Sequence, residues 1–246
     1  MLKNERTRQI LNVLEQKGYA SVKELGEMLF ASESSIRRDL TELESNGHIR
    51  RSYGGAELIK SHTSVLPFNT RTYNNIAEKK IIAAKAARLI GDGNIVFLDS
   101  SSTGYFLAYE IMNRADITVV TNSVEILALL SQGKARVHST GGILSRDNRI
   151  CLVGRNAEKG FEDVNADIAF FSAGALSDDG VISDCTQEEV FVRNAMLENA
   201  ALKVFLCNFG KIGKRSAFVQ CCLSDVDYLI CEEDISEKFG TQCELM

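Results

Sequence analysis

The segment SESSIRRDL, residues 32–40, places small hydroxyl side chains immediately ahead of two adjacent arginines. Small residues at the start of a helix allow close approach to an anion, and the helix N–H groups there face it. Arginine is suited to bidentate contact with guanine or phosphate. The segment therefore predicts a helix that enters the major groove of DNA. The residues expected to contact DNA are Ser34, Ser35, Arg37, Arg38 and Thr41.

The alternative for the same segment is an ordinary solvated helix whose arginines make local ion pairs. Arg37 and Arg38 taken alone favour that alternative, and only the surrounding elements reverse the choice. Asp39 is expected to orient an arginine or to cap a backbone group rather than to touch DNA.

A second group of polar residues follows several apolar runs in the larger, C-terminal part of the chain. Hydroxyl and N–H groups between a strand and a helix make a phosphate cradle, and open α/β sheets bind ligands at that edge. Ser/Thr clusters after strands are more often helix caps, and a lone lysine is more often solvated. Several strand ends with the same chemistry nevertheless favour a pocket. The residues expected to line it are Asp99, Ser100, Ser101, Ser102, Thr103, Thr121, Asn122, Ser123, Gly141, Gly142 and Lys211.

Two short helices are predicted ahead of the SESSIRRDL segment. Residues 4–17 carry apolar side chains at helical spacing, with Asn4 as the expected N-cap and Gly18 as the stop. The second helix opens with the capping box Ser21-Val-Lys-Glu24. Its inward-facing residues are expected to be Leu25, Met28 and Leu29.

The third helix is expected to begin after Ser32 and to end at Gly47, with Ile36, Leu40 and Leu43 on its apolar face. Three short helices, the last two joined by a tight turn, predict a helix-turn-helix. Residues 48–59 read as a hairpin around Gly54-Gly55, which is a wing. The wing residues expected to contact DNA are Arg51, Tyr53 and Gly54.

From residue 76 onward, helical and strand patterns alternate. Helices are expected at 76–89, 106–111, 124–130 and 188–200. Strands are expected at 94–98, 117–120, 135–139, 167–172, 203–207 and 227–231. This alternation predicts an α/β domain with a mainly parallel sheet. The predicted organisation is a winged helix-turn-helix domain at 1–58, a linker at 59–75 that holds Pro67, and an effector-binding and oligomerisation domain at 76–246.

Composition restricts the classes of protein that fit. The net charge is −5, but residues 1–60 hold ten basic against nine acidic residues, so affinity for nucleic acid is expected in that segment. No apolar run reaches the roughly 20 residues of a membrane span, and no signal peptide opens the chain, so a cytoplasmic protein is expected. The seven cysteines lack paired C-x-x-C spacing, so no metal site is expected. A redox-active Cys221-Cys222 pair is the less favoured alternative to cysteines that simply pack in the core.

The segment SESSIRRDLTELESNGHIRRSYGGAEL, with ERTRQILNVL ahead of it, resembles the DeoR family of bacterial transcription regulators. The resemblance extends through LDSSSTG, VVTNS, TGG and LCNFGK in the C-terminal part. It implies a sensor domain similar to the ribose-5-phosphate isomerase and CoA-transferase fold, with a pocket for a phosphorylated sugar or a related metabolite. Three positions depart from the family pattern: Ser35 replaces threonine, Tyr53 replaces a frequent histidine, and Asn208 replaces the usual aspartate.

The sequence therefore favours a DNA-binding repressor of carbohydrate metabolism genes that responds to an effector. A homo-oligomer is expected, because symmetric operators need paired heads. The alternative is a sugar-phosphate isomerase-like enzyme with an accessory DNA-binding head. Isomerisation needs a general base beside the sugar carbons, and the strand at 168–172 leads to no carboxylate, although Glu188 and Glu189 remain candidate acids. No catalytic residue and no cofactor are expected.

Overall fold

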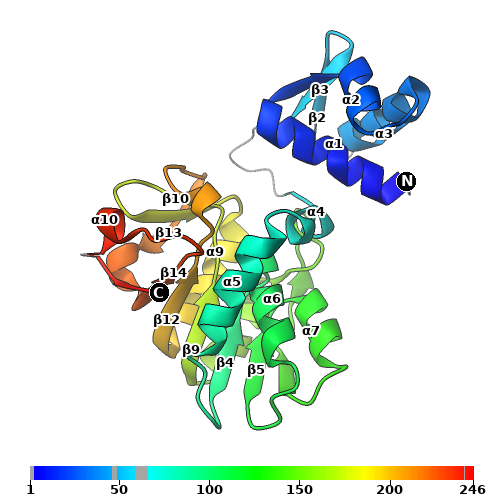
Figure 1. Ribbon diagram of the computed structural model, residues 1–246. Coiled ribbons are helices and arrows are strands. Elements are labelled where there is room, and N and C mark those ends of the chain that lie inside the picture. The colour runs from blue at the N-terminus through cyan, green and yellow to red at the C-terminus, as the bar shows by residue number, and fades with distance from the viewer. Residues whose placement is uncertain (1–2, 46–48, 59–65, 241) are drawn as a thin grey trace. The chain divides into compact units, whose positions relative to one another are not determined.

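The computed structural model describes residues 3–45, 49–58, 66–240 and 242–246 of the chain. The chain divides into two compact units, Met1–Asn74 and Asn75–Met246, whose elements are labelled in Figure 1. No helix in the described parts is long and apolar enough to cross a membrane.

The N-terminal unit is a winged helix-turn-helix, as predicted. Its helices pack around a core of aliphatic side chains, and a three-stranded antiparallel sheet in the order β1-β3-β2 completes it. The elements are α1 (Lys3–Lys17), β1 (Tyr19–Ser21), α2 (Val22–Met28), α3 (Glu33–Ser45), β2 (Ile49–Ser52) and β3 (Gly55–Leu58). The three-residue strand β1, which pairs with β3, is too short to show a pattern and was not predicted.

The predicted capping box holds the start of α2. The Ser21 hydroxyl accepts a hydrogen bond from the Glu24 N–H at 3.2 Å, and the Ser21 N–H donates to the Glu24 carboxylate at 2.8 Å. Two predictions for the first two helices are wrong. Asn4 lies inside α1, which begins at Lys3. Met28 is 46% exposed, because α2 ends at this residue; of the three residues predicted to face inward, Leu25 and Leu29 are buried.

Helix α3 begins where the sequence predicts. The Ser32 hydroxyl accepts from the Ser35 N–H at 3.3 Å, as an N-cap does. Ile36, Leu40 and Leu43 are buried in the core of the unit. The predicted end of this helix at Gly47 lies outside the described residues.

The predicted hairpin is present as β2 and β3. Ser52 pairs with Gly55, which leaves Tyr53 and Gly54 as a two-residue turn, one position earlier than predicted. The φ angles of these two residues are +44° and +77°, and a type I′ hairpin turn requires positive φ at both positions. The Tyr19 hydroxyl donates to the Tyr53 carbonyl at 3.1 Å, so the first strand supports the tip of the wing.

The segment predicted as a linker, residues 59–75, contains a helix. This is α4 (Phe68–Tyr73), in which Phe68 and Thr70 are buried. A six-residue helix is too short to show apolar periodicity, which explains why the sequence pattern missed it. Residues 59–65 of the predicted linker lie outside the described residues.

The C-terminal unit is an α/β domain built on a parallel sheet, as predicted. Seven strands lie in the order β15-β14-β12-β9-β4-β5-β6, and every described pairing among them is parallel. The sheet strands are β4 (Ile95–Leu98), β5 (Thr118–Thr121), β6 (Arg136–Ser139), β9 (Ala166–Phe171), β12 (Ala200–Leu206), β14 (Tyr228–Ile230) and β15 (Glu244–Leu245). The main helices are α5 (Ile76–Ala87), α6 (Ser102–Ile111), α7 (Val124–Leu130), α8 (Arg155–Glu162) and α9 (Gln187–Glu198).

Shorter elements complete the unit. They are β7 (Ile143–Leu144), β8 (Leu152–Val153), β10 (Ala175–Leu176), β11 (Val181–Asp184), η1 (Phe209–Lys211), β13 (Phe218–Cys222), η2 (Leu223–Asp225) and α10 (Ser236–Phe239). The strands β10, β11 and β13 form a separate antiparallel sheet. None of these elements was predicted, and neither was α8, because each is short or mostly polar.

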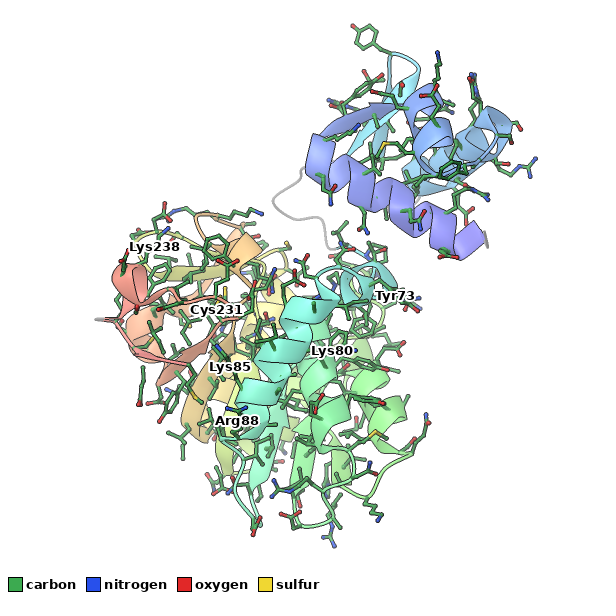
Figure 2. The ribbon with its side chains drawn as sticks, viewed as in Figure 1. Tyr73, Lys80, Lys85, Arg88, Cys231 and Lys238 are labelled. Carbon is green, nitrogen blue, oxygen red and sulfur yellow. The ribbon has the colours of Figure 1, made fainter. Side chains whose placement is uncertain are left out.

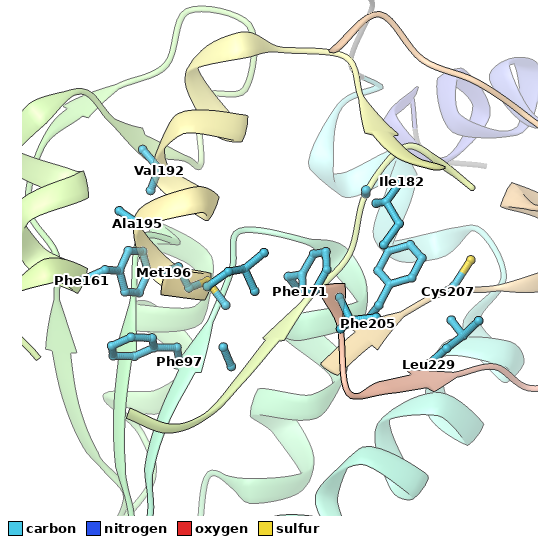
Figure 3. Close-up of a cluster of buried hydrophobic side chains, with 14 of the residues drawn as sticks. Phe97, Phe161, Phe171, Ile182, Val192, Ala195, Met196, Phe205, Cys207 and Leu229 are labelled. Carbon is cyan, nitrogen blue, oxygen red and sulfur yellow. The ribbon is translucent and has the colours of Figure 1, made fainter. Parts of the chain in front are cut away.

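The sheet has a core on each face, since successive strand residues point to opposite sides. Val96 and Leu98 pack on the face covered by α5, α6 and α7, which lie side by side in Figure 1. Phe97 packs on the other face with Phe161 of α8 and Met196 of α9, as Figure 3 shows. The two helical layers therefore fix the sheet between them.

A polar contact joins α5 to the sheet at one end. The Lys85 ammonium donates to the Cys231 carbonyl, directly after β14, at 2.8 Å. Figure 2 labels both residues, with Lys85 on α5 and Cys231 beside it. This contact lies near the carboxyl ends of the strands, which is the edge where the pocket was predicted.

Candidate functional site

Helix α3 presents a polar face to solvent. Ser34, Arg37, Arg38 and Thr41 are exposed, and Ser35 is half-buried. The Ser35 N–H donates to the Ser32 hydroxyl. The face carries hydroxyl groups in its first turn and two guanidinium groups in its second. This is the arrangement that the sequence predicted for a helix that contacts DNA.

The two arginines of α3 have different surroundings. Arg37 pairs with Glu33 at 2.8 Å on the same helix, so the local ion pair of the alternative interpretation is present for this residue. In the described part of the N-terminal unit, nothing pairs with the Arg38 guanidinium. Arg38 is therefore available for a bidentate contact with a base edge.

Asp39 lies on the buried side of α3. It is 1% exposed, and it accepts hydrogen bonds from the Arg6 guanidinium of α1, one of them 3.2 Å long. The Asp39 side chain raises the pKa of Arg6 through these bonds, although burial opposes this. The prediction that Asp39 orients an arginine is confirmed, and that arginine is Arg6.

The wing residues lie on the same unit. Arg51 donates to the Thr41 hydroxyl at 3.3 Å, which links the wing to α3. Tyr53 is fully exposed at the tip of the turn, beside Gly54. A non-glycine residue with positive φ costs roughly 1–2 kcal/mol, so the fold holds this aromatic ring outward at an energetic cost. Its contact with DNA stays a prediction.

The predicted pocket residues lie at the carboxyl edge of the seven-stranded sheet. Strands β4 and β5 run toward one side of the sheet and β9 lies on the other side of β4, so the strand order reverses between β4 and β9. Open α/β sheets bind ligands at such a reversal. Asp99 follows β4 and Ser172 follows β9, so these two residues flank it.

Asp99 and Lys211 are brought together through Ser172. The Asp99 carboxylate accepts from the Ser172 N–H at 3.0 Å and from the Ser101 N–H at 3.1 Å. The Lys211 ammonium donates to the Ser172 hydroxyl at 2.8 Å. Asn208, the position of the missing aspartate, is buried directly before η1, and its carbonyl accepts from the Lys211 N–H at 3.0 Å.

Several predicted pocket residues act as caps within the fold. The Ser101 hydroxyl accepts from the Gly104 N–H at 2.9 Å, and the Ser123 hydroxyl accepts from the Ile126 N–H at 3.3 Å. The Thr121 hydroxyl accepts from the Ser123 N–H at 3.1 Å. Ser102 and Thr103 are buried in the first turn of α6. Ser101 and Ser123 are therefore helix caps, which was the alternative to a binding role. A cap can also contact a ligand, so their role in binding stays a prediction.

Gly141 and Gly142 satisfy a demand of the backbone. Their φ angles are +70° and +118°. A Cβ on Gly142 would lie 2.8 Å from the Val153 carbonyl oxygen and 2.9 Å from the Ala157 Cβ. The close approach that requires glycine here is to the protein's own α8, which the sequence pattern missed. Contact of these two glycines with a ligand stays a prediction.

A buried arginine was missed by the sequence analysis. Arg193 of α9 is 4% exposed and lies 3.0 Å from Asp184, 3.5 Å from Asp99 and 3.9 Å from Glu189. It also donates to the Gln220 side chain at 2.8 Å. Burial disfavours the charge on Arg193, but the three carboxylates outweigh burial and raise its pKa above the ordinary value.

A signal for Arg193 exists in the sequence. It stands three residues after Val190 and four before Leu197, on the buried stripe of α9. An arginine in that place needs carboxylates around it. Glu189, considered as a candidate acid, is buried and accepts from the Asn148 amide at 3.0 Å, whereas Glu188 is exposed.

A small cavity, called the inner cavity below, lies beside this cluster. Its volume is about 10 Å³, which is room for a single water-sized group and far below the 300–1,000 Å³ typical of ligand pockets. It is lined by Asp99, Ser100, Asn122, Phe161, Glu189, Val192, Arg193 and Met196. Three of the predicted pocket residues, Asp99, Ser100 and Asn122, are among them. Figure 3 shows the apolar wall, with Phe161, Val192 and Met196 close together.

Burial raises the thiol pKa of five cysteines, which are Cys151, Cys207, Cys221, Cys231 and Cys243. Burial raises the pKa of Cys207 to about 12 and that of Cys221 to about 12. Cys221 is therefore protonated at neutral pH, which leaves the Cys221-Cys222 pair with at most one reactive thiol. Within residues 3–45, 49–58, 66–240 and 242–246, no group of three or more His, Cys, Asp or Glu side chains could hold a metal ion.

Comparison with known proteins gives matches along most of the chain. Residues 6–62 match the family model described as the DeoR-like helix-turn-helix domain. Residues 74–233 match the model described as the DeoR C terminal sensor domain.

Two relatives and one solved structure are also similar to this chain. The HTH-type transcriptional regulator GlpR of Haloferax volcanii is 32% identical over 94% of this chain and 90% of its own. The lactose phosphotransferase system repressor of Staphylococcus aureus is 30% identical over 98% of this chain and 96% of its own. The solved structure of ribose 5-phosphate isomerase A from Methanocaldococcus jannaschii aligns with 56% of this chain and 55% of its own, at 19% identity and a TM-score of 0.44.

Proposed function

This chain belongs to the DeoR family of transcriptional regulators, and from that premise we propose that it represses carbohydrate metabolism genes by binding operator DNA. We further propose that a phosphorylated sugar or a related metabolite changes its affinity for that DNA. Family membership makes the chain a regulator rather than an enzyme. The name of the lactose phosphotransferase system repressor supports carbohydrate genes as the targets.

The observation that carries DNA binding is the exposed polar face of α3 on a helix-turn-helix. Arg38, exposed and unpaired among the described residues, is proposed to read a base edge. Arg37 and Arg51, each held by a neighbouring side chain, are proposed to contact phosphates. Ser34, Ser35, Thr41, Tyr53 and Gly54 complete the proposed DNA-binding surface.

Selection from a pool of random DNA duplexes tests this half of the proposal. The full-length protein should enrich one sequence, and its affinity for that sequence should exceed its affinity for random DNA by about 10³-fold or more. Enrichment of no sequence would contradict operator binding. The genes that neighbour this one on the chromosome supply candidate operators for the same assay.

Polar contacts at the carboxyl edge of the sheet support the second part of the proposal, that a phosphorylated sugar binds this chain. Asp99, Ser172 and Lys211 meet there beside the inner cavity. The N-terminus of α6 and the Lys211 ammonium supply positive potential for a phosphate group. The remaining predicted pocket residues, from Ser100 to Gly142, are proposed to shape this site directly or through the caps that they form.

We expect replacement of Lys211 with alanine to weaken binding of phosphorylated ligands more than binding of the same sugars without phosphate. A charge-assisted hydrogen bond contributes about 1.5–3 kcal/mol, so the difference should be roughly tenfold or more. Isothermal titration calorimetry measures both affinities. Lys214→Ala, an exposed lysine three residues on, is the control. Equal weakening of both ligand forms would separate Lys211 from the phosphate.

We also expect a homo-oligomer, at least a dimer, assembled through residues 75–246. One winged helix-turn-helix covers few base pairs, and paired heads bind symmetric operators. Most aliphatic residues of the N-terminal unit are used in its own small core, although Met28 and Phe30 lie exposed on α2 and in the turn after it. Sedimentation velocity at micromolar concentration should give twice the mass of the chain or more. A monomer with and without operator would contradict this.

A further inference from the structure

The inner cavity contains two polar atoms that have no hydrogen-bond partner. The Asn122 Oδ1 is an acceptor and the Arg193 Nε–H is a donor, and neither is paired among the described residues. Both side chains are 4% exposed and both line the cavity. The nearest carboxylate oxygen to Arg193 Nε is Asp99 Oδ2, at 3.5 Å, which is too long for a good hydrogen bond.

The rest of each side chain is already engaged. The Asn122 amide group donates to the Leu152 carbonyl at 3.1 Å, which fixes its orientation and leaves Oδ1 unsatisfied. The Arg193 terminal nitrogens bond to Gln220 and pair with Asp184. Buried polar groups are ordinarily hydrogen-bonded, so a donor and an acceptor left together in one cavity point to an absent partner.

The cavity's charge limits what that partner is. Asp99 and Glu189 line the cavity, and Asp184 lies against Arg193. Three carboxylates therefore surround one guanidinium. A phosphate group brings negative charge and only acceptor oxygens, so it would be repelled here. A hydroxyl group is neutral, so the carboxylates do not repel it. Its one O–H can donate to the Asn122 Oδ1 while its oxygen accepts from the Arg193 Nε–H.

We propose that the inner cavity binds the hydroxyl-bearing end of the effector and excludes its phosphate. This inference rests on the proposed function, because it takes a phosphorylated sugar as the ligand. The phosphate stays outside, toward the N-terminus of α6 and Lys211. The cavity has room for one water-sized group, which fits a subsite for a single hydroxyl at that end of the molecule.

Matched sugar phosphates test the orientation with the unmodified full-length protein. The probes are fructose 6-phosphate, glucose 6-phosphate and ribose 5-phosphate, each compared with its 1-phosphorylated bisphosphate and its 1-deoxy analogue by calorimetry. Whichever monophosphate binds, its bisphosphate and its 1-deoxy analogue should each bind at least about tenfold more weakly, since a site built for a hydroxyl rejects ligands that lack it.

The variant Asn122→Ala tests the residue. The ratio of affinities for the monophosphate and its 1-deoxy analogue should fall toward one, while urea unfolding shows that the fold persists. If this variant does not fold, the comparison of monophosphate and bisphosphate binding to the unmodified protein decides whether the orientation is right. A bisphosphate that binds as tightly as its monophosphate, or an unchanged ratio in Asn122→Ala, overturns the orientation but leaves the proposed function. Failure of all three monophosphates to bind overturns the orientation as proposed for these sugars and counts against the effector half of the proposed function, while operator binding is tested separately by selection from random DNA.

Discussion

Replacing Arg193 with methionine should lower the free energy of unfolding of the C-terminal unit by about 3–5 kcal/mol at neutral pH. The guanidinium is buried and lies within 4.0 Å of three carboxylates, Asp99, Asp184 and Glu189. Methionine fills a similar volume but leaves these carboxylates close together without a cation. The expected loss of stability therefore comes from buried carboxylates without a cation and not from lost packing.

Urea unfolding of the full-length chain, followed by circular dichroism, measures this effect. Arg215→Met is the matched control, because Arg215 pairs with Asp179 at the surface, where both side chains are 60% exposed. That loss should be about 0–1 kcal/mol. Adding Asp184→Asn to Arg193→Met should restore part of the lost stability. Equal stability losses at Arg193 and Arg215 would contradict the electrostatic role of the cluster.

Replacing Arg38 with alanine should lower affinity for the specific operator by about 1–3 kcal/mol, which is roughly 5- to 150-fold. Its guanidinium is exposed on α3 and unpaired in the described part of its unit, so no internal contact is lost. Stability and affinity for random DNA should change little. The measurement is fluorescence anisotropy with the selected operator and with random DNA at one salt concentration.

Arg37→Ala is the control for Arg38→Ala. Arg37 is held by Glu33, and as a phosphate contact its loss should weaken all DNA about equally. It should also reduce the slope of log affinity against log salt by about one. If Arg38→Ala leaves discrimination between operator and random DNA unchanged, Arg38 does not read a base.

The N-terminal unit was predictable because its signals are local. The capping box at Ser21 and Glu24, the cap at Ser32 and the hairpin turn each depend on residues within a few positions of one another. The prediction that Met28 faces inward was wrong because α2 ends at this residue, and the sequence does not show where the helix ends. No pattern within seven residues contains that information.

The C-terminal site was predictable only in part, because its geometry depends on contacts between distant segments. The hydroxyl clusters lie at the carboxyl edge of the sheet, as predicted, since strand ends are visible in the sequence. Their role in binding stays a prediction. Arg193 and Asp99 are far apart in the chain and meet only once α9 packs on the sheet. Likewise, Gly142 is required by the approach of α8, an element whose polar sequence carries little apolar pattern.

The most direct test of the central claim, that a sugar phosphate controls operator binding, is the operator affinity of the full-length protein with and without such ligands. Fluorescence anisotropy with the selected operator should show that at least one sugar phosphate changes the Kd by about 5- to 150-fold, the usual range of coupling between two sites. Lys211→Ala should need more of that ligand for the same change. An operator Kd that no sugar phosphate alters, with specific DNA binding intact, would contradict the claim.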